Sequence, residues 1–297
     1  MAILNLTPDS FSDGGSYPTV AAAVGRAARA VEEGAELLDL GGESTRPGAQ
    51  AVDAAEQVRR VLPVLRAIRA DRGFDGVGIT VDTTLAAVAA EALDAGADGI
   101  NDVSAGLGDP EMLDLVARRG AGVILMHRLR PPVADSYSDR YEQPPVYPDG
   151  VVMEVRRFLE ARRRAAEEAG VAPEAIAADP GLGFGKTVEQ NLELLAAGVA
   201  AVPAGCPLVS GISRKSFTAR AAGIPPEAPP RERAGASAGL SAVHLAAGAR
   251  IFRVHDVGLH VAVLRAAWSA LRGTAGPAER LALEQGATAR PVAPGGS

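Results

Sequence analysis

Short apolar segments alternate with longer amphipathic segments along almost the whole chain. The apolar segments have the length and composition of buried strands, and they cover residues 2–6, 36–40, 78–82, 98–101, 122–126, 175–179, 207–211 and 250–254. The segments between them have the apolar periodicity of helices, and they cover residues 20–33, 53–70, 85–95, 110–118, 151–169, 188–200, 232–247 and 256–271. Apolar strands that are each followed by a helix are typical of parallel sheets with crossover connections.

Eight such strand–helix units predict an α/β fold, a (β/α)8 TIM barrel formed by a single domain over residues 1–272. The competing fold is a doubly wound open sheet. Sheets of that kind carry a glycine-rich phosphate signature after their first strand, and this chain lacks one there. Residues 273–297 are rich in Gly, Ala and Pro, and we expect them to form a flexible C-terminal tail.

Composition and charge exclude several classes of function. The chain has 297 residues, of which 47% are hydrophobic, and its formal net charge is −6. Because the chain has no basic field, we expect neither nucleic acid nor a membrane as a partner, although a small anionic substrate stays compatible with local positive charge. Cys206 is the only cysteine, and the N-terminal residues lack the pattern of a secretory signal, so we expect a cytoplasmic protein.

A glycine-rich turn follows the sixth predicted strand, with the sequence DPGLGFGKT at residues 179–187. Asp179 ends the strand, and the glycines allow a sharp turn or a close approach to a ligand. Two nucleotide-binding motifs fail here, because Pro180 and Lys186 stand where a P-loop and a dinucleotide fingerprint, respectively, need glycine. The turn by itself is weak evidence of a site, because an ordinary turn at the end of a strand explains it equally well.

Residues 128–150 form the longest irregular segment, and they join the fifth predicted strand to its helix. The segment contains several prolines and tyrosines. Loops of this length are usually functional or mobile.

Polar residues follow every predicted strand. In a barrel these positions meet at the mouth formed by the carboxyl ends of the strands, where active sites lie. Helix caps would explain any one of them. They do not easily explain five side chains directed at one cavity, which are those of Asp82, Asn101, Asp179, Lys215 and Arg253.

The chemistry of these residues separates into two zones. Asp82, Asn101, Asp179 and Lys215 offer acceptors, an amide and a cationic donor, which suit a flat heterocycle with adjacent N–H groups and a carbonyl. The second zone is a cationic group with neutral ligands beside it, which suits a phosphate-type oxyanion; it contains Arg46, Arg253, His255, Asn5 and Ser216.

The strand ends resemble those of the dihydropteroate synthases, enzymes of the folate pathway. The matching stretches occur in the family's order over nearly all of the chain: ILNLTPDSFSDGG from residue 3, DLGGESTRPG from 39, VDT from 81, INDV from 100, LMH from 125, DPGLGFGKT from 179, SRKSF from 213 and RVHD from 253. Together these motifs are highly specific, whereas none of them is specific alone.

The resemblance implies the barrel fold and a reaction. That reaction joins 4-aminobenzoate to 6-hydroxymethyl-7,8-dihydropterin pyrophosphate and gives 7,8-dihydropteroate and pyrophosphate. It implies that the two substrates are small molecules and that Mg²⁺ is the cofactor, with Asn5 as its ligand. It further implies mobile loops at residues 7–15 and 44–48, and a homodimer formed through the last helices.

The resemblance also implies a role for each residue that matches a motif. The pterin-binding residues are Asp82, Asn101, Val103, Met126, Asp179, Gly183, Phe184 and Lys215. The pyrophosphate-binding residues are Asn5, Thr45, Arg46, Arg253 and His255. The aminobenzoate site is framed by Thr45, Pro47, Phe184, Lys215 and Ser216. The residues expected to act in catalysis are Asp82, Asp179, Lys215, Arg253 and His255.

Two alternative functions share some of these features. A methyltetrahydrofolate-binding methyltransferase domain has the same barrel and a similar Asp/Asn pocket, but it would not need the basic residues at positions 214–215 and 253–255. A non-catalytic paralogue that only binds pterin would be expected to lose residues of the first loop or of the pyrophosphate group. All of those residues are present in this chain.

Overall fold

The structure is a computed structural model, and it describes residues 1–7 and 19–274. Its strands are β1 (Ala2–Asn5), β2 (Leu37–Gly41), β3 (Gly78–Asp82), β4 (Gly99–Asp102), β5 (Gly122–Met126), β6 (Ile176–Asp179), β7 (Val209–Ser210) and β8 (Ile251–Phe252). Its α-helices are α1 (Val20–Glu32), α2 (Ala54–Ala70), α3 (Ala86–Asp94), α4 (Met112–Arg119), α5 (Val151–Glu168), α6 (Val188–Ala197), α7 (Ser216–Ala221), α8 (Ala234–Ala246) and α9 (Val257–Thr274).

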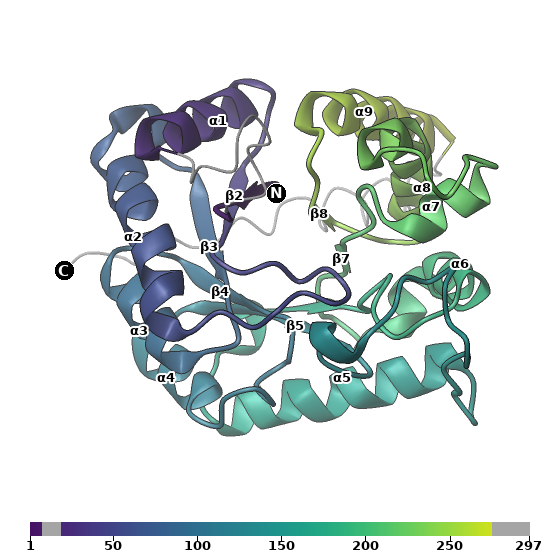
Figure 1. Ribbon diagram of the computed structural model, residues 1–297, viewed down its shortest axis with the longest axis horizontal. Helices are drawn as coiled ribbons and strands as arrows, with labels where there is room; N and C mark the ends of the chain where they lie inside the picture. Colours follow the sequence, from purple (N-terminus) through teal and green to yellow (C-terminus); the bar gives the residue numbers. More distant parts are fainter. Residues whose placement is uncertain (8–18, 275–297) are drawn as a thin grey trace.

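The strands close into a parallel barrel. Strands β1 to β6 form one sheet in chain order, and β7 pairs with β8. Two isolated parallel bridges join these parts, one from Ala178 to Leu208 and one from Ala2 to Val254. The helices follow one another around the strands in chain order (Figure 1). The predicted (β/α)8 barrel is therefore confirmed, and the open sheet is excluded.

Alternation along each strand separates two apolar regions. On β5 and β6, Val123, Leu125 and Ala178 belong to the large core between the strands and the helices. Their neighbours Ile124 and Ala177 belong to a second, small cluster with Val209, which lies inside the barrel. Because successive side chains of a strand point to opposite faces, every second residue of each strand faces the barrel interior.

The register of the strands places the candidate residues at one end of the barrel. Asn5 pairs with Gly41, Gly41 with Asp82, and Asp82 with Asn101, so these residues form one row across β1 to β4. Met126 and Asp179 are partners at the ends of β5 and β6. The parallel pairing therefore gathers residues that are far apart in the sequence at the mouth of the barrel.

The helix boundaries agree with ordinary capping signals. The side chains of Thr19 and Asp53 accept backbone N–H groups at the starts of α1 and α2. Thr187 and Gln190 form a capping box at the start of α6. Caps of this kind satisfy N–H groups that have no partner within the helix. In the part of the chain that the structure describes, no helix is both long and apolar enough to cross a membrane.

Three details differ from the sequence predictions. Helix α7 was not predicted, because six residues are too few to show a periodic pattern. Strands β7 and β8 are shorter than predicted, with two paired residues each. Helix α9 runs to Thr274, past the predicted start of the tail at residue 273. The rest of that tail, residues 275–297, lies outside the described residues, as do residues 8–18 of the first loop.

Gly99 tests the register between β4 and β5. It pairs with Gly122, and a Cβ atom at position 99 would lie 2.7 Å from the Gly122 carbonyl oxygen. We expect Gly99→Ala to lower the free energy of unfolding by about 1–3 kcal/mol, because the strands must separate to admit the methyl group. Urea unfolding followed by circular dichroism measures this loss.

Gly235→Ala is the matched control, because Gly235 lies in α8 and nothing lies within 4 Å of a Cβ atom built there. An alanine in a helix is favoured over glycine by about 0.5–1 kcal/mol, so this variant should be unchanged or more stable. A Gly99→Ala variant as stable as the wild-type protein would contradict the strand register.

Candidate active site

The structure brings the predicted acceptors together at the mouth of the barrel. Asp82, Asn101 and Asp179 end β3, β4 and β6 or lie within one residue of the end, and each is at most 5% exposed. Burial of carboxylates is costly unless they find partners. We therefore describe the site through the hydrogen-bonding and charged groups that pair with these buried side chains.

Arg253 is the main partner of the buried carboxylates. It follows β8, its side chain is 18% exposed, and its Nε atom donates to Oδ2 of Asp39 at 2.6 Å. Its Nη2 atom donates to Oδ2 of Asp82 at 2.7 Å. The two zones predicted from the sequence are thus not separate, because the arginine assigned to the oxyanion is paired with an aspartate assigned to the heterocycle.

Asp39 belongs to the same buried cluster, and the sequence analysis did not select it. Its side chain is fully buried on β2, and it accepts hydrogen bonds from Thr80 Oγ1 at 2.6 Å, Asn101 Nδ2 at 3.1 Å and Arg253 Nε at 2.6 Å. Lys, Glu, Arg and Asp are almost never fully buried unless they are paired. The available signal was the position of this aspartate inside the apolar segment LLDLG, rather than at its end.

The electrostatics of the mouth reflect burial first and neighbouring charges second. Burial raises the pKa of Asp82 to about 7, the Arg253 guanidinium opposes that rise, and the Asp39 carboxylate adds to it. Burial also raises the pKa of Asp179, and Lys215 opposes it. Burial lowers the pKa of Lys215 to about 8, against the effect of Asp179. Opposite charges are therefore held close together in a site with little water to screen them.

The glycine-rich turn after β6 is shaped around a buried lysine. Lys186 is fully buried, and its Nζ atom donates to the carbonyl oxygens of Gly181 at 3.0 Å and Phe184 at 2.8 Å. The same atom lies 3.0 Å from Nδ1 of His127. Burial lowers the pKa of His127 to about 2, and the charge of Lys186 adds to this effect. Burial lowers the pKa of Lys186 to about 7. His127 is therefore a neutral acceptor beneath the turn.

Two glycine positions are required by this shape. Gly181 has φ +68°, and a Cβ atom there would overlap the carbonyl oxygen of His127. Its N–H donates to Oδ1 of Asp179 at 2.7 Å. Gly183 has φ +83°, and a Cβ atom there would lie 2.6 Å from Cδ of Lys215. Only glycine adopts such angles freely, so these two residues let the turn lie close to the His127 carbonyl group and the Lys215 side chain.

Residues 128–150 hold the glycine-rich turn from outside. Asp135 Oδ2 accepts the N–H of Gly185 at 2.9 Å, and the Tyr147 hydroxyl donates to the carbonyl of Gly185 at 2.8 Å. The carbonyl of Pro132 accepts the N–H of Gly48 at 2.9 Å, which ties the second loop to this segment. The long loop thus takes part in the site as a support for two other loops.

Lys215 and an apolar cluster border the acceptors. Val103, Met126 and Phe184 form a buried cluster of their own, apart from the large core. The Nζ atom of Lys215 lies 4.3 Å from the centre of the Phe184 ring and donates to the carbonyl of Leu182. This arrangement gives the site an apolar wall beside its hydrogen-bonding groups, as ligand pockets usually have.

The outer residues lie around His255. Its Nδ1 atom is 3.1 Å from Oγ of Ser213, which also accepts its backbone N–H at 3.1 Å. Burial lowers the pKa of His255 to about 3, and Arg214 and Arg253 add to this effect. His255 is therefore neutral, although the sequence analysis placed it in a cationic group. Arg214 is held by Asp256, with 2.8 Å between Nε and Oδ2.

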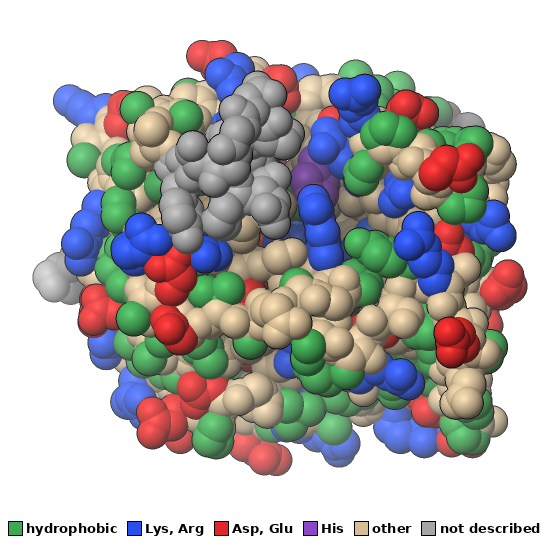
Figure 2. Space-filling model, viewed as in Figure 1, with side chains coloured by type: hydrophobic (Ala, Val, Ile, Leu, Met, Phe, Trp, Pro, Cys, Tyr) green, Lys and Arg blue, Asp and Glu red, His purple; other side chains and the backbone are tan. Residues whose placement is uncertain are grey.

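The remaining predicted residues line the rim. Arg46 is exposed, Thr45 and Pro47 are half-buried on the same loop, and Asn5 is half-buried at the end of β1. Ser216 is the first residue of α7. Basic side chains and a histidine gather near the middle of the face shown in Figure 2. The rim therefore carries positive charge although the chain as a whole is acidic.

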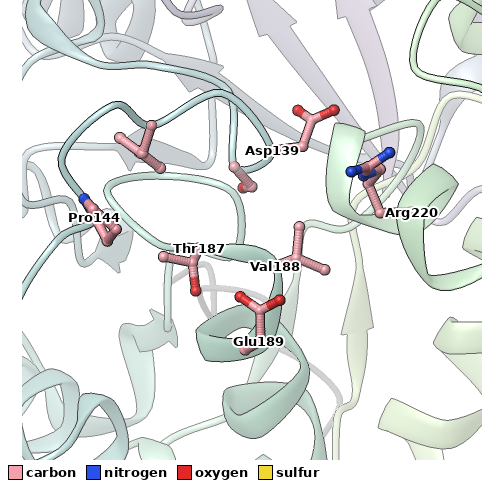
Figure 3. A pocket seen from close by; sticks show the side chains of 8 residues that line it. Asp139, Pro144, Thr187, Val188, Glu189 and Arg220 are labelled. Carbon is pink, nitrogen blue, oxygen red and sulfur yellow. The ribbon is translucent and has the colours of Figure 1, made fainter.

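A separate cavity of about 490 Å³ lies beside this site, between the long loop, the start of α6 and α7. Asp139, Val188, Glu189 and Arg220 surround it (Figure 3). It contains none of the residues predicted for the site. Its carboxylates and its guanidinium come from different elements, and Thr187 at the end of the glycine-rich turn also lines it.

A family model described as pterin binding enzyme matches residues 1–255. The chain belongs to the pterin-binding enzyme family.

Relatives within this family are similar over most of their length. The dihydropteroate synthase of Streptococcus pyogenes is 45% identical over 257 residues, which cover 86% of this chain and 90% of the relative. The dihydropteroate synthase of Synechocystis sp. is 42% identical over 258 residues, with 86% and 84% covered. In both alignments the covered fractions of the two chains are large enough to include most of the barrel.

Solved structures agree with these relatives. The Xanthomonas albilineans dihydropteroate synthase with 4-aminobenzoic acid has a TM-score of 0.80 and 41% identity, and 93% of each chain is covered. The same enzyme in complex with 7,8-dihydropteroate has a TM-score of 0.77 and 38% identity, with 93% of this chain and 94% of that one covered. The Yersinia pestis enzyme in a sulfonamide complex has a TM-score of 0.79 and 36% identity, with 93% and 94% covered.

Gly183 offers a test of how this pterin-binding enzyme positions Lys215. We expect Gly183→Ala to weaken binding of a pterin at least about tenfold, because the methyl group must displace the Lys215 side chain. Calorimetric titration with 6-hydroxymethylpterin measures the affinity.

Gly205→Ala is the matched control, because Gly205 has φ +78° and no atom within 4 Å of a Cβ atom built there. Both variants carry the cost of a left-handed alanine, about 1–2 kcal/mol of stability. If both variants bind the pterin equally well, Lys215 is not held in place by the glycine-rich turn.

Proposed function

We infer that this pterin-binding enzyme is a dihydropteroate synthase. It condenses 6-hydroxymethyl-7,8-dihydropterin pyrophosphate with 4-aminobenzoate and releases pyrophosphate. The observation that carries this inference is the buried set of Asp82, Asn101 and Asp179 directly beside Arg253 and a basic rim. The dihydropteroate synthases similar to this chain support it, since two of their structures contain 4-aminobenzoic acid or 7,8-dihydropteroate.

The pterin ring lies among the buried acceptors. A carboxylate accepts two hydrogen bonds from adjacent N–H groups, and the amino-pyrimidine edge of a pterin presents such a pair. Asp179 has one oxygen occupied by Gly181 N–H and leaves Oδ2 for the ligand. Val103, Met126 and Phe184 supply the apolar wall, Gly183 allows the close approach of the turn, and Lys215 supplies a donor.

The reaction breaks the bond to pyrophosphate at a carbon beside an electron-rich ring. Bond breaking can run ahead of bond making, so positive charge develops on the pterin. Asp82 and Asp179 lie buried next to that ring and stabilise the charge in a site that excludes water. The neutral amino group of 4-aminobenzoate needs no strong base in order to attack. The residues described at the mouth accordingly supply charge and position.

The pyrophosphate leaves toward the rim. Arg46, with Thr45 beside it, Arg253 and the neutral His255 offer donors there, with Ser213 holding the His255 ring. The described residues contain no group of three or more His, Cys, Asp or Glu side chains that could hold a metal ion. Mg²⁺ commonly takes one or two protein oxygens and completes its shell with water and substrate phosphates, so Asn5 alone fits as its protein ligand. When bound, Mg²⁺ would neutralise charge on the departing pyrophosphate.

The 4-aminobenzoate lies between the glycine-rich turn and the second loop. Phe184 and Pro47 can contact the two faces of its ring, while Lys215, Thr45 and the start of α7 at Ser216 offer hydrogen bonds to its carboxylate. The attacking amino group would then face the pterin. Residues 8–18 of the first loop lie outside the described residues, so the closure expected of this loop stays a prediction.

The assembly and location follow the same inference. We propose a cytoplasmic homodimer in which α8 and α9, which pack on each other, form the contact between subunits. Val243 and Leu259 are exposed apolar side chains on these two helices, as a helix face in such a contact would require. The methyltransferase alternative is not favoured, because it does not account for the basic residues that follow β7 and β8.

A pyrophosphate-release assay tests the function directly. The purified chain with Mg²⁺ should release pyrophosphate only when both the dihydropterin pyrophosphate and 4-aminobenzoate are present, with 7,8-dihydropteroate formed in equal amount. Release without 4-aminobenzoate would indicate a hydrolase. No release, with pterin binding intact, would indicate a non-catalytic pterin-binding protein.

Asp179→Asn should weaken pterin binding while the fold survives. The amide oxygen can still accept the Gly181 N–H, so the turn keeps its shape. The amide nitrogen then presents a donor where the pterin needs an acceptor, and the unpaired groups cost about 1–3 kcal/mol, or roughly fivefold to 150-fold in affinity. Titration with 6-hydroxymethylpterin measures this, and affinity within about twofold of wild type, a difference of roughly 0.4 kcal/mol, would remove Asp179 from the pterin site.

A further inference from the structure

Asp39 lies one layer below the mouth of the barrel, two residues before the end of β2. It is fully buried, and the register pairs it with Ile3 on β1 and Thr80 on β3. Both of its oxygens are occupied, Oδ1 by Thr80 and Oδ2 by Asn101 and Arg253. A carboxylate that contacts only other side chains acts on the reaction through them.

The bond to Asn101 decides which end of that amide faces the ligand. Asn101 Nδ2 donates to Asp39 Oδ2 at 3.1 Å. The amide oxygen is therefore turned away from Asp39 and is left to accept. An ionised carboxylate is an acceptor only, so it enforces this orientation of Asn101 and rejects the flipped one.

The bond to Arg253 fixes the guanidinium in the same way. Nε is taken by Asp39 at 2.6 Å and Nη2 by Asp82 at 2.7 Å, so the planar fork is held between β2 and β3. Since the guanidinium is rigid, these two bonds also determine where its remaining N–H groups point. Asp39 thus reaches both the pterin-binding amide and the arginine assigned to the pyrophosphate.

We propose that Asp39 is a positioning residue that orients Asn101 and Arg253 and thereby sets the pattern of acceptors and donors offered to the pterin pyrophosphate. This proposal rests on the proposed function for its substrate, and it concerns the same site. It assigns the aspartate of β2 a role in recognising the pterin that it exerts through Asn101 and Arg253.

A second consequence follows from the charge of Asp39. The charged groups that act on Asp82 are Arg253, Asp39, Asp102 and Glu43. The charge of Asp82 in turn affects the pKa values of two cations, Lys215 and Arg128. Burial raises the pKa of Asp82 to about 7, Arg253 opposes this, and Asp39 raises it further. The ionised form of Asp82 accepts from the pterin, so pterin affinity should fall as pH drops through this pKa. Neutralising position 39 should move that fall to lower pH.

Two variants separate the hydrogen bonds of Asp39 from its charge. In Asp39→Asn the amide oxygen can accept from Arg253 and Asn101, and the amide nitrogen can donate to Thr80 Oγ1. The Thr80 hydroxyl can then turn to the carbonyl of Leu38, which lies 3.5 Å away. This variant therefore keeps the geometry and loses the charge, whereas Asp39→Ala loses both.

The experiment is calorimetric titration of wild type and both variants with 6-hydroxymethylpterin from pH 5.5 to 9. At pH 8.5, where Asp82 is ionised, Asp39→Asn should bind within about threefold of wild type and Asp39→Ala at least about tenfold more weakly. The acid limb of the Asp39→Asn profile should lie about half a pH unit or more below that of wild type. In turnover, Asp39→Ala should raise KM for the pterin pyrophosphate and leave KM for 4-aminobenzoate unchanged.

Several results would overturn the proposal. An acid limb at the wild-type position in Asp39→Asn would show that the charge at residue 39 does not reach Asp82. Wild-type affinity in Asp39→Ala would show that Asn101 and Arg253 need no orientation. If Asp39→Ala does not fold, the Asp39→Asn profile alone decides. The titrations need no turnover, so failure of the proposed synthase activity would be seen separately in the pyrophosphate assay.

Discussion

The ion pairs of Arg253 with Asp39 and Asp82 are the interaction on which the site depends. The partners are 214 and 171 residues away from Arg253 in the sequence, and they meet because the chain after β8 closes the barrel against β1. Two carboxylates next to each other in a dry interior would repel and lose their charge. The guanidinium opposes the rise that burial causes in the pKa of Asp82, and the two carboxylates in turn raise the pKa of Arg253 although burial opposes it. The charges of these three side chains and the orientation of Arg253 therefore both depend on closure of the barrel.

The other half of the mouth depends on the buried Lys186, whose amine is held by two backbone carbonyl groups and a histidine. Lys186 donates to the carbonyls of Gly181 and Phe184 and contacts the neutral His127. This turns the peptide groups of the glycine-rich turn so that Gly181 N–H meets Asp179 and Leu182 C=O meets Lys215. The turn thereby holds Lys215 against the Phe184 ring at the edge of the acceptor pocket.

Several residues show how far sequence reasoning reached. The apolar strands and the polar residues at their ends were predictable, because parallel strands in a barrel must place their carboxyl ends together; Asp82, Asn101 and Asp179 are where that rule puts them. The resemblance to a family supplied their roles. Asp39 was missed, since a buried aspartate two residues before the end of its strand has no local signal of its partners. His255 was expected to be cationic, and only its burial beside Arg214 and Arg253 makes it neutral.

The sequence by itself determined the eight strand–helix units, the barrel, the family motifs and the residue types at the mouth, because periodicity and turn chemistry act over a few residues at a time. The tertiary structure alone decided which of these residues are paired and which are left for a ligand. Arg253 is held by two carboxylates, Asn101 is turned by Asp39, and the long loop supports the turn through Asp135 and Tyr147. Such pairings depend on strand register and on closure of the barrel, which bring together groups that no local pattern connects.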